Sequence, residues 1–114
     1  MKLSTIYRIE NKDGIGPYKE SMGFEDDHPV YKMALDHNRL PTSSGDKGIE
    51  RVAKGFEYFG FKSMKQLEKW FSKNEIEMLK TYGFHIVEMY GHVTAVGEYQ
   101  VLFERVSSLF EEKL

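Results

Sequence analysis

The alternation of hydrophobic and polar residues predicts three strands. Residues 3–10 alternate between β-branched or aromatic side chains and polar ones, which is typical of a strand with one face covered. Residues 84–90 and 98–104 have the same enrichment and predict two further strands, joined by a connection over residues 91–97. An antiparallel pair is the simplest arrangement of these last two strands, although a connection of this length permits others.

Apolar residues at helical spacing predict helices in the middle of the chain and at its end. A helix is expected to begin at Asp46 and to end within residues 58–61. A second pattern predicts a C-terminal helix from Val106 onward. The apolar positions that carry these two predictions are Ile49, Val52, Ala53 and Phe56 in the first helix, and Val106, Leu109, Phe110 and Leu114 in the second.

Two capping boxes give the strongest local signal in the chain. Ser63 with Gln66, and Ser72 with Glu75, both have the spacing at which a serine hydroxyl and an amide or carboxylate satisfy the first N–H groups of a helix. They predict a short helix that stops and a second helix that restarts at once and ends at Gly83.

The N-terminal half is rich in glycine and proline. One short helix is expected there, capped by Asp27 or His28, with Pro29 in its first turn and an end near Asn38. Loops of this length in a compact domain are frequently functional, so binding residues are expected among them. Together the elements predict an α+β fold, a small mixed or antiparallel sheet packed against several short helices with a long loop-rich N-terminal half, in a single domain over residues 1–114.

Composition narrows the function classes. The 114 residues carry 16 basic and 18 acidic side chains, a net charge of -2, which makes bulk nucleic-acid binding through phosphate neutralisation unlikely. Cysteine is absent from the sequence, so disulfides and thiolate chemistry are excluded. No apolar run is long enough to span a bilayer, and the N-terminus lacks a signal-peptide pattern. We therefore expect a cytoplasmic protein without a membrane partner.

The candidate binding residues gather around the first strand and the loops. Arg8, with Tyr7 beside it and glycines just after the strand, could hold a phosphate or carboxylate. The alternative is an arginine on a solvated face, paired with Glu10 or Glu104. Tyr18 could stack on or cover a ligand.

Two further candidates lie elsewhere in the chain. His37 could donate or accept a hydrogen bond to a ligand, and the spacing of the histidines and aspartates matches no metal signature, so no metal site is predicted. Glu98 and Gln100 share one face of the last strand and could serve acid–base or hydroxyl-binding roles, or form an exposed polar face. Trp70 and Phe71, at helical spacing with Leu67, are expected in the core.

Several motifs resemble those of a family of small uncharacterised proteins of phages and prophages. These motifs are residues 7–11, 13–14, 16–18, 60–63, 66–67, 70–71, 83–84 and 100–103. The resemblance covers most of the chain and implies an accessory protein of a virus or mobile element, with interference with host defence as one task. No known reaction is implied by these motifs.

The chain is also similar, over fewer residues, to ADP-ribosyltransferase-like folds. In those folds a Tyr-Arg pair on the first strand holds NAD and a glutamate on a late strand is catalytic, which implies corresponding roles for Tyr7, Arg8 and Glu98. The order here is Glu98-x-Gln100 rather than Gln-x-Glu.

Three hypotheses follow. The leading one is a binding module in which Tyr7, Arg8, Tyr18, His37 and Gln100 hold an anionic, nucleotide-like ligand. The second is an NAD-dependent transferase with Glu98 as its catalytic carboxylate, and the third is an inhibitor that binds a host protein through its loops. Sequence alone does not decide whether the protein is an enzyme.

Overall fold

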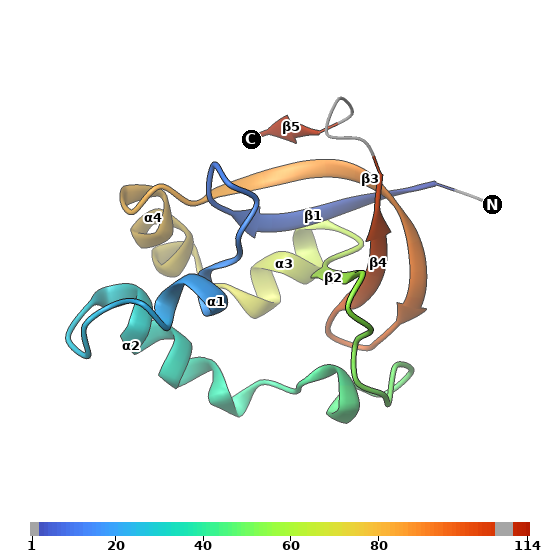
Figure 1. Ribbon diagram of the computed structural model, residues 1–114, viewed down its shortest axis with the longest axis horizontal. Helices are drawn as coiled ribbons and strands as arrows, with labels where there is room; N and C mark the ends of the chain where they lie inside the picture. The colour runs from blue at the N-terminus through green and yellow to red at the C-terminus, as the bar shows by residue number, and fades with distance from the viewer. Residues whose placement is uncertain (1–2, 107–110) are drawn as a thin grey trace.

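The α+β prediction is confirmed by the computed structural model, which describes residues 3–106 and 111–114. An antiparallel sheet curls around its own core, and short helices cover one side of it (Figure 1). The elements, in chain order, are β1 (Ser4–Glu10), α1 (Pro17–Ser21), α2 (Pro29–Asp36), the 3₁₀ turns η1 (His37–Arg39) and η2 (Ser43–Gly45), β2 (Glu57–Gly60), α3 (Met64–Trp70), α4 (Lys73–Thr81), β3 (His85–Val96), β4 (Val101–Arg105) and β5 (Glu112–Lys113).

The sheet is nearly closed. Its strands follow the order β1-β3-β4-β2 and every pairing is antiparallel. The two outer strands then meet, because the backbones of Tyr7 and Phe61 exchange two hydrogen bonds of 2.8 Å. The short β5 pairs with β3 at Val87 and Glu88, on the side of the sheet away from α1 and α2 (Figure 1). Closure places one set of side chains inside the curl and leaves few free strand edges.

Two glycines make room for the ring at the centre of the curl. Phe103 is fully buried, with Ile6 and Met89 around it. A Cβ on Gly91 would lie 2.6 Å from the Phe103 ring, and one on Gly60 would lie 2.9 Å from it. Gly91 therefore lies inside a continuous strand, and the predicted connection over 91–97 is wrong: β3 runs on to Val96. Glycine marks a close approach here rather than a turn.

The turn between β3 and β4 is held by a buried carboxylate. Asp46, fully buried, accepts hydrogen bonds from the backbone N–H groups of Glu98, Tyr99 and Gln100. Because Asp46 is committed to this turn and Glu50 adopts a positive φ of 54°, the helix predicted from Asp46 does not form. Val52 is 76% exposed, and the segment leads into β2 instead.

The predictions of the helices α2, α3 and α4 hold. His28 caps α2 through its side chain, which accepts from the N–H of Val30, and Pro29 opens the helix. Ser72 and Glu75 form the complete capping box of α4. Ser63 caps α3, although the Gln66 side chain accepts from the N–H of Lys62 rather than from that of Ser63. The five-residue helix α1 was not predicted.

The prediction of a C-terminal helix is wrong for residues 112–113, which form a strand. Leu109 and Phe110 lie outside the described residues, while Glu112–Lys113 form β5.

The main core lies between the sheet and the helices and includes Trp70, Phe71 and Phe84. In the part of the chain that the structure describes, no helix is both long and apolar enough to cross a bilayer.

Candidate functional site

A cleft of about 870 Å³ lies between the N-terminal helices and the strands β1 and β2. Arg8, Tyr18, His37 and Gln100, four of the residues selected from the sequence, all line it. They come from β1, α1, η1 and the position just before β4, which are far apart in the chain. The fold therefore brings four of the selected residues to one place, together with aromatic side chains of β2 and α3.

Arg8 is fixed in the wall of this cleft. Its Nε donates to Glu10 at 3.0 Å and its Nη1 donates to the carbonyl of Phe59 at 2.8 Å, and only 14% of the side chain is exposed. The guanidinium lies 5.3 Å from the centre of the Tyr58 ring. Burial lowers the pKa of Arg8, although the Glu10 carboxylate acts in the opposite direction. The pairing with Glu10 matches one sequence-based alternative, but the side chain is not on a solvated face.

Glu10 is shared between two arginines. Both of its carboxylate oxygens accept from Arg105, at 2.9 and 2.5 Å, and Arg105 also binds Glu111. The hydrogen bonds that Arg105 donates to the carboxylates of Glu111 and Glu10 raise the pKa of Arg105. The guanidinium of Arg105, like that of Arg8, lies 5.3 Å from the centre of the Tyr58 ring. The two arginines and the two glutamates thus form a network with balanced charge. The hydrogen bond to Glu10, which is itself held by Arg105, keeps Arg8 in one orientation.

A chain of hydrogen bonds crosses the other wall of the cleft. Trp70 Nε1 donates to the Tyr18 hydroxyl at 2.6 Å, and that hydroxyl lies 2.5 Å from His37 Nδ1. His37 Nε2 lies 2.8 Å from a carboxylate oxygen of Glu75. The other oxygen of Glu75 accepts from the N–H of Ser72 at 2.8 Å, as part of the α4 capping box. Four side chains from α1, η1, α3 and α4 are therefore connected in series.

For a neutral imidazole at His37, the donors and acceptors fix where the protons lie. An indole N–H can only donate, so the Tyr18 oxygen is an acceptor from Trp70 and its own proton is available for His37 Nδ1. Neutral His37 then carries its proton on Nε2 and donates it to Glu75. Burial raises the pKa of Tyr18. The hydroxyl is consequently protonated at neutral pH and rests against an unprotonated imidazole nitrogen.

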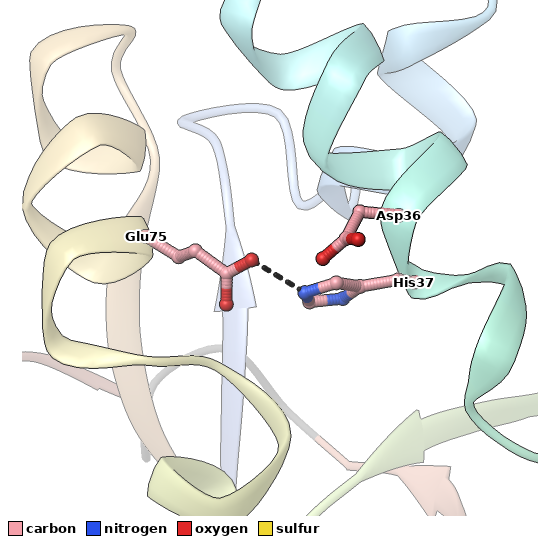
Figure 2. A group of neighbouring side chains, drawn as sticks. All are labelled: Asp36, His37 and Glu75. Atoms are coloured by element: carbon pink, nitrogen blue, oxygen red, sulfur yellow. Dashed lines mark hydrogen bonds and ion pairs between the residues drawn. The ribbon is translucent and has the colours of Figure 1, made fainter.

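Asp36 adds a second carboxylate beside His37 and Glu75. One ligand atom from each of these three residues lies within 4.8 Å of the others (Figure 2). Figure 2 shows His37 and Glu75 facing each other across the gap between η1 and α4, with Asp36 at the end of α2 next to them. A cation would use His37 Nε2, but that nitrogen already faces Glu75 at hydrogen-bond distance. The geometry fits a hydrogen-bonded chain better than a metal centre.

Two of the selected residues, Tyr7 and Glu98, are not in the cleft lining. Tyr7 packs against the main core, and a hydrogen bond to Glu88 raises its pKa. Glu98 is exposed at the turn between β3 and β4, where its backbone carbonyl accepts from Gln66. Gln100 does line the cleft, and its side-chain amide donates to the carbonyl of Pro41 at 3.2 Å.

Sequence reasoning missed two members of the hydrogen-bonded chain. Glu75 was fully accounted for by its capping box, and Trp70 was expected only in the core. Both expectations are correct as far as they go, since Glu75 caps α4 and Trp70 is 9% exposed. Their second contacts join residues 38 and 52 positions apart, and no local pattern signals such a contact.

Comparison with known proteins gives a family. The family described as bacteriophage T4 Y00F protein matches residues 1–113, nearly the whole chain. The chain belongs to this family. The expectation of a phage protein is thereby confirmed. The Y00F family match names no reaction and no ligand. No curated protein and no solved structure gives a significant match.

Proposed function

We propose that this Y00F-family protein is a phage accessory protein that binds a small anionic, nucleotide-like ligand in the cleft beside β1. The observation that carries the proposal is the convergence of Arg8, Tyr18, His37 and Gln100 on one cleft. Its volume of about 870 Å³ lies within the range of about 300–1,000 Å³ that is usual for small-molecule sites.

Arg8 supports the anionic part of the proposal. Two of its nitrogens are used by Glu10 and by the Phe59 carbonyl, whereas Nη2 has no hydrogen-bond partner among residues 3–106 and 111–114. This nitrogen lies 3.3 Å from the position of a Cβ on Gly16, so a larger residue there would crowd it. A guanidinium held by its other bonds can donate to a phosphate or carboxylate with little loss of side-chain entropy.

The aromatic residues support the nucleotide-like part. Tyr58, Phe59 and Phe71 line the same cleft as Arg8, and Phe59 is 41% exposed. Planar rings of this kind stack on bases with little dependence on base identity. Capture of a nucleotide signal of the host would place such a protein in counter-defence, which extends the same proposal.

Binding to purified protein tests the proposal. Isothermal titration with a panel of nucleoside mono- and diphosphates, cyclic nucleotides and NAD should give at least one saturable ligand. Loss of one charge-assisted hydrogen bond costs about 1.5–3 kcal/mol, so Arg8→Gln should weaken that ligand about 10- to 100-fold. Arg39→Gln is the matched control, since Arg39 is exposed and lies outside the cleft lining. Absence of binding by every member of the panel would contradict the proposal.

The same samples address the transferase alternative. Mass spectrometry after incubation with NAD distinguishes a retained ligand from a consumed one. Glu98, the proposed catalytic carboxylate, lies in the β3–β4 turn and not in the cleft lining, which favours binding over transfer. NAD consumption that is abolished by Glu98→Ala would reverse this preference.

A protein partner is a second candidate function. Met22 and Leu35, both in the cleft lining, are 84% and 52% exposed, so the rim offers apolar surface to another chain. Capture of a host protein that is lost in Leu35→Arg but kept in Arg8→Gln would favour an inhibitor over a nucleotide-binding module.

A further inference from the structure

We propose that Tyr18 is a nucleophile, activated by His37 and Glu75, toward an electrophilic phosphorus group bound in the cleft. The hydroxyl, the imidazole and the carboxylate stand in series, at 2.5 Å and 2.8 Å. This is the arrangement of an activated nucleophile: a hydroxyl within reach of a base, and a base oriented by a third group. The activation of Tyr18 is argued independently of nucleotide binding. The assignment of a phosphorus group as the electrophile rests on the anion-binding role proposed for Arg8.

The base is held rigidly and away from water. The His37 side chain is 1% exposed, and that of Glu75 is 21% exposed. The Glu75 carboxylate is fixed a second time by the Ser72 N–H, so it cannot turn away from His37 without breaking the α4 cap. A buried imidazole with a fixed carboxylate on Nε2 can accept a proton on Nδ1 and remain paired as an imidazolium.

Trp70 acts on the same oxygen atom. Its N–H donates to the Tyr18 hydroxyl at 2.6 Å, and this bond strengthens as negative charge develops on that oxygen. Tyr18, His37 and Trp70 all line the cleft, so a bound electrophile can come next to the hydroxyl. Burial raises the pKa of Tyr18, so the proton must be removed during the attack and not before it.

The step balances without a further reactant. The Tyr18 oxygen attacks phosphorus, an O–P bond forms, and the bond from phosphorus to its leaving group breaks. The leaving group departs with the electron pair, and the Tyr18 proton passes to His37 Nδ1. His37 keeps its Nε2 proton throughout and donates it in the hydrogen bond to the Glu75 carboxylate. The product is an aryl phosphoester on Tyr18, with His37 as an imidazolium that can return its proton to the leaving group.

The alternative is a purely structural chain that fastens α1 and η1 to the two helices behind them. The structural and the activating interpretations differ in one measurable property, the reactivity of the Tyr18 hydroxyl. A structural chain protects the hydroxyl of Tyr18, whereas an activating chain makes it react faster than other tyrosines. Exposure alone favours Tyr82 and Tyr99, at 42% and 44%, over Tyr18 at 37%.

Labelling with an alkyl fluorophosphonate tests the proposal on the whole protein. Peptide mass spectrometry gives the rate of phosphonylation at each tyrosine in one sample, with loss of fluoride. General-base assistance contributes about 10²-fold or more, so Tyr18 should be labelled about 10²-fold faster than Tyr82 and Tyr99. Labelling of Tyr18 at or below the rate of those two residues would overturn the proposal.

Glu75→Gln then tests the positioning role of the carboxylate. Glutamine also completes a capping box, so α4 should keep its cap. With its oxygen on the Ser72 N–H, the amide turns its NH₂ toward His37 Nε2, which places the imidazole proton on Nδ1, facing Tyr18. The imidazole can no longer accept the Tyr18 proton. The rate at Tyr18 relative to Tyr99 should fall roughly ten-fold or more.

Two controls separate these outcomes from loss of structure. Glu77→Gln alters an exposed carboxylate on the same helix and should leave the ratio unchanged. Comparison of the tyrosines within one sample is the second control, because local unfolding would make their labelling rates similar. Fast labelling of Tyr18 that persists undiminished in Glu75→Gln would refute the triad, and nucleotide titration of the same samples shows separately whether the binding function stands.

Discussion

Removal of a single oxygen at Tyr18 should measurably destabilise the protein. Tyr18→Phe keeps the ring, which stacks on Phe71 with centroids 6.0 Å apart, but breaks the bonds to Trp70 and His37. The indole N–H and an imidazole nitrogen would then lack partners, in side chains whose residues are 9% and 5% exposed. Each unsatisfied buried group costs about 1–3 kcal/mol. Because the cleft can admit water to part of this site, we expect a total near 2 kcal/mol.

Urea denaturation followed by tryptophan fluorescence measures this loss directly. Trp70 is the only tryptophan in the sequence, so the probe reports on the residue that loses its hydrogen bond. Unfolding free energy should fall by about 2 kcal/mol, which corresponds to a Tm lower by about 8 °C for a domain of this size. The native emission maximum should shift as well.

A matched substitution makes the result interpretable. Tyr99→Phe removes a hydroxyl from a residue that is 44% exposed and should change stability by less than about 0.5 kcal/mol. Equal stability of Tyr18→Phe and the native protein would refute the reasoning, because it would mean that the hydroxyl satisfies neither the indole nor the imidazole.

Two further predictions concern the sheet. Gly91→Ala forces a methyl group to within 2.6 Å of the Phe103 ring and should lower the free energy of unfolding by about 1–3 kcal/mol, measured by thermal unfolding. The control Gly55→Ala places a methyl group where no atom lies within 4 Å and should leave stability unchanged. Equal effects of the two substitutions would contradict the close approach inside the curl. Hydrogen bonds from Arg51 lower the pKa of Glu57 below its ordinary value of 4.5, so the stability that Glu57 supplies is complete above that pH and is lost as the pH falls below it. Urea denaturation between pH 7 and pH 3 should therefore show a steeper loss for the native protein than for Glu57→Gln, and parallel curves would exclude this role.

Local signals were sufficient for much of the fold. The first strand, the His28 cap and the Ser72 capping box depend on contacts within a few residues, and the structure contains all three. The helix expected from Asp46 failed because a long-range role prevailed over a local pattern. The Asp46 carboxylate accepts hydrogen bonds from three backbone N–H groups of the turn at 98–100, and this position is incompatible with the predicted helix. The periodicity of the local sequence contains no sign of these long-range bonds.

Glycine misled the strand assignment for a related reason. Gly91 indicates a turn when only its neighbours in sequence are considered. Its actual role is to let the ring of Phe103 approach the backbone of β3. The distinction between a turn and a close approach depends on a residue of another strand, so it arises only once the sheet has formed.

Sequence alone was enough to assign an α+β chain with tandem capped helices and to select Arg8, Tyr18, His37 and Gln100 as candidate binding residues. The tertiary structure decided that these four share one cleft, that Tyr7 and Glu98 do not, and that Glu75 and Trp70 complete a chain through Tyr18 and His37. The physical reason is the range of the interactions. Caps and strand periods are settled over a few residues, whereas a hydrogen bond between helices depends on how they pack, which is determined by the whole core.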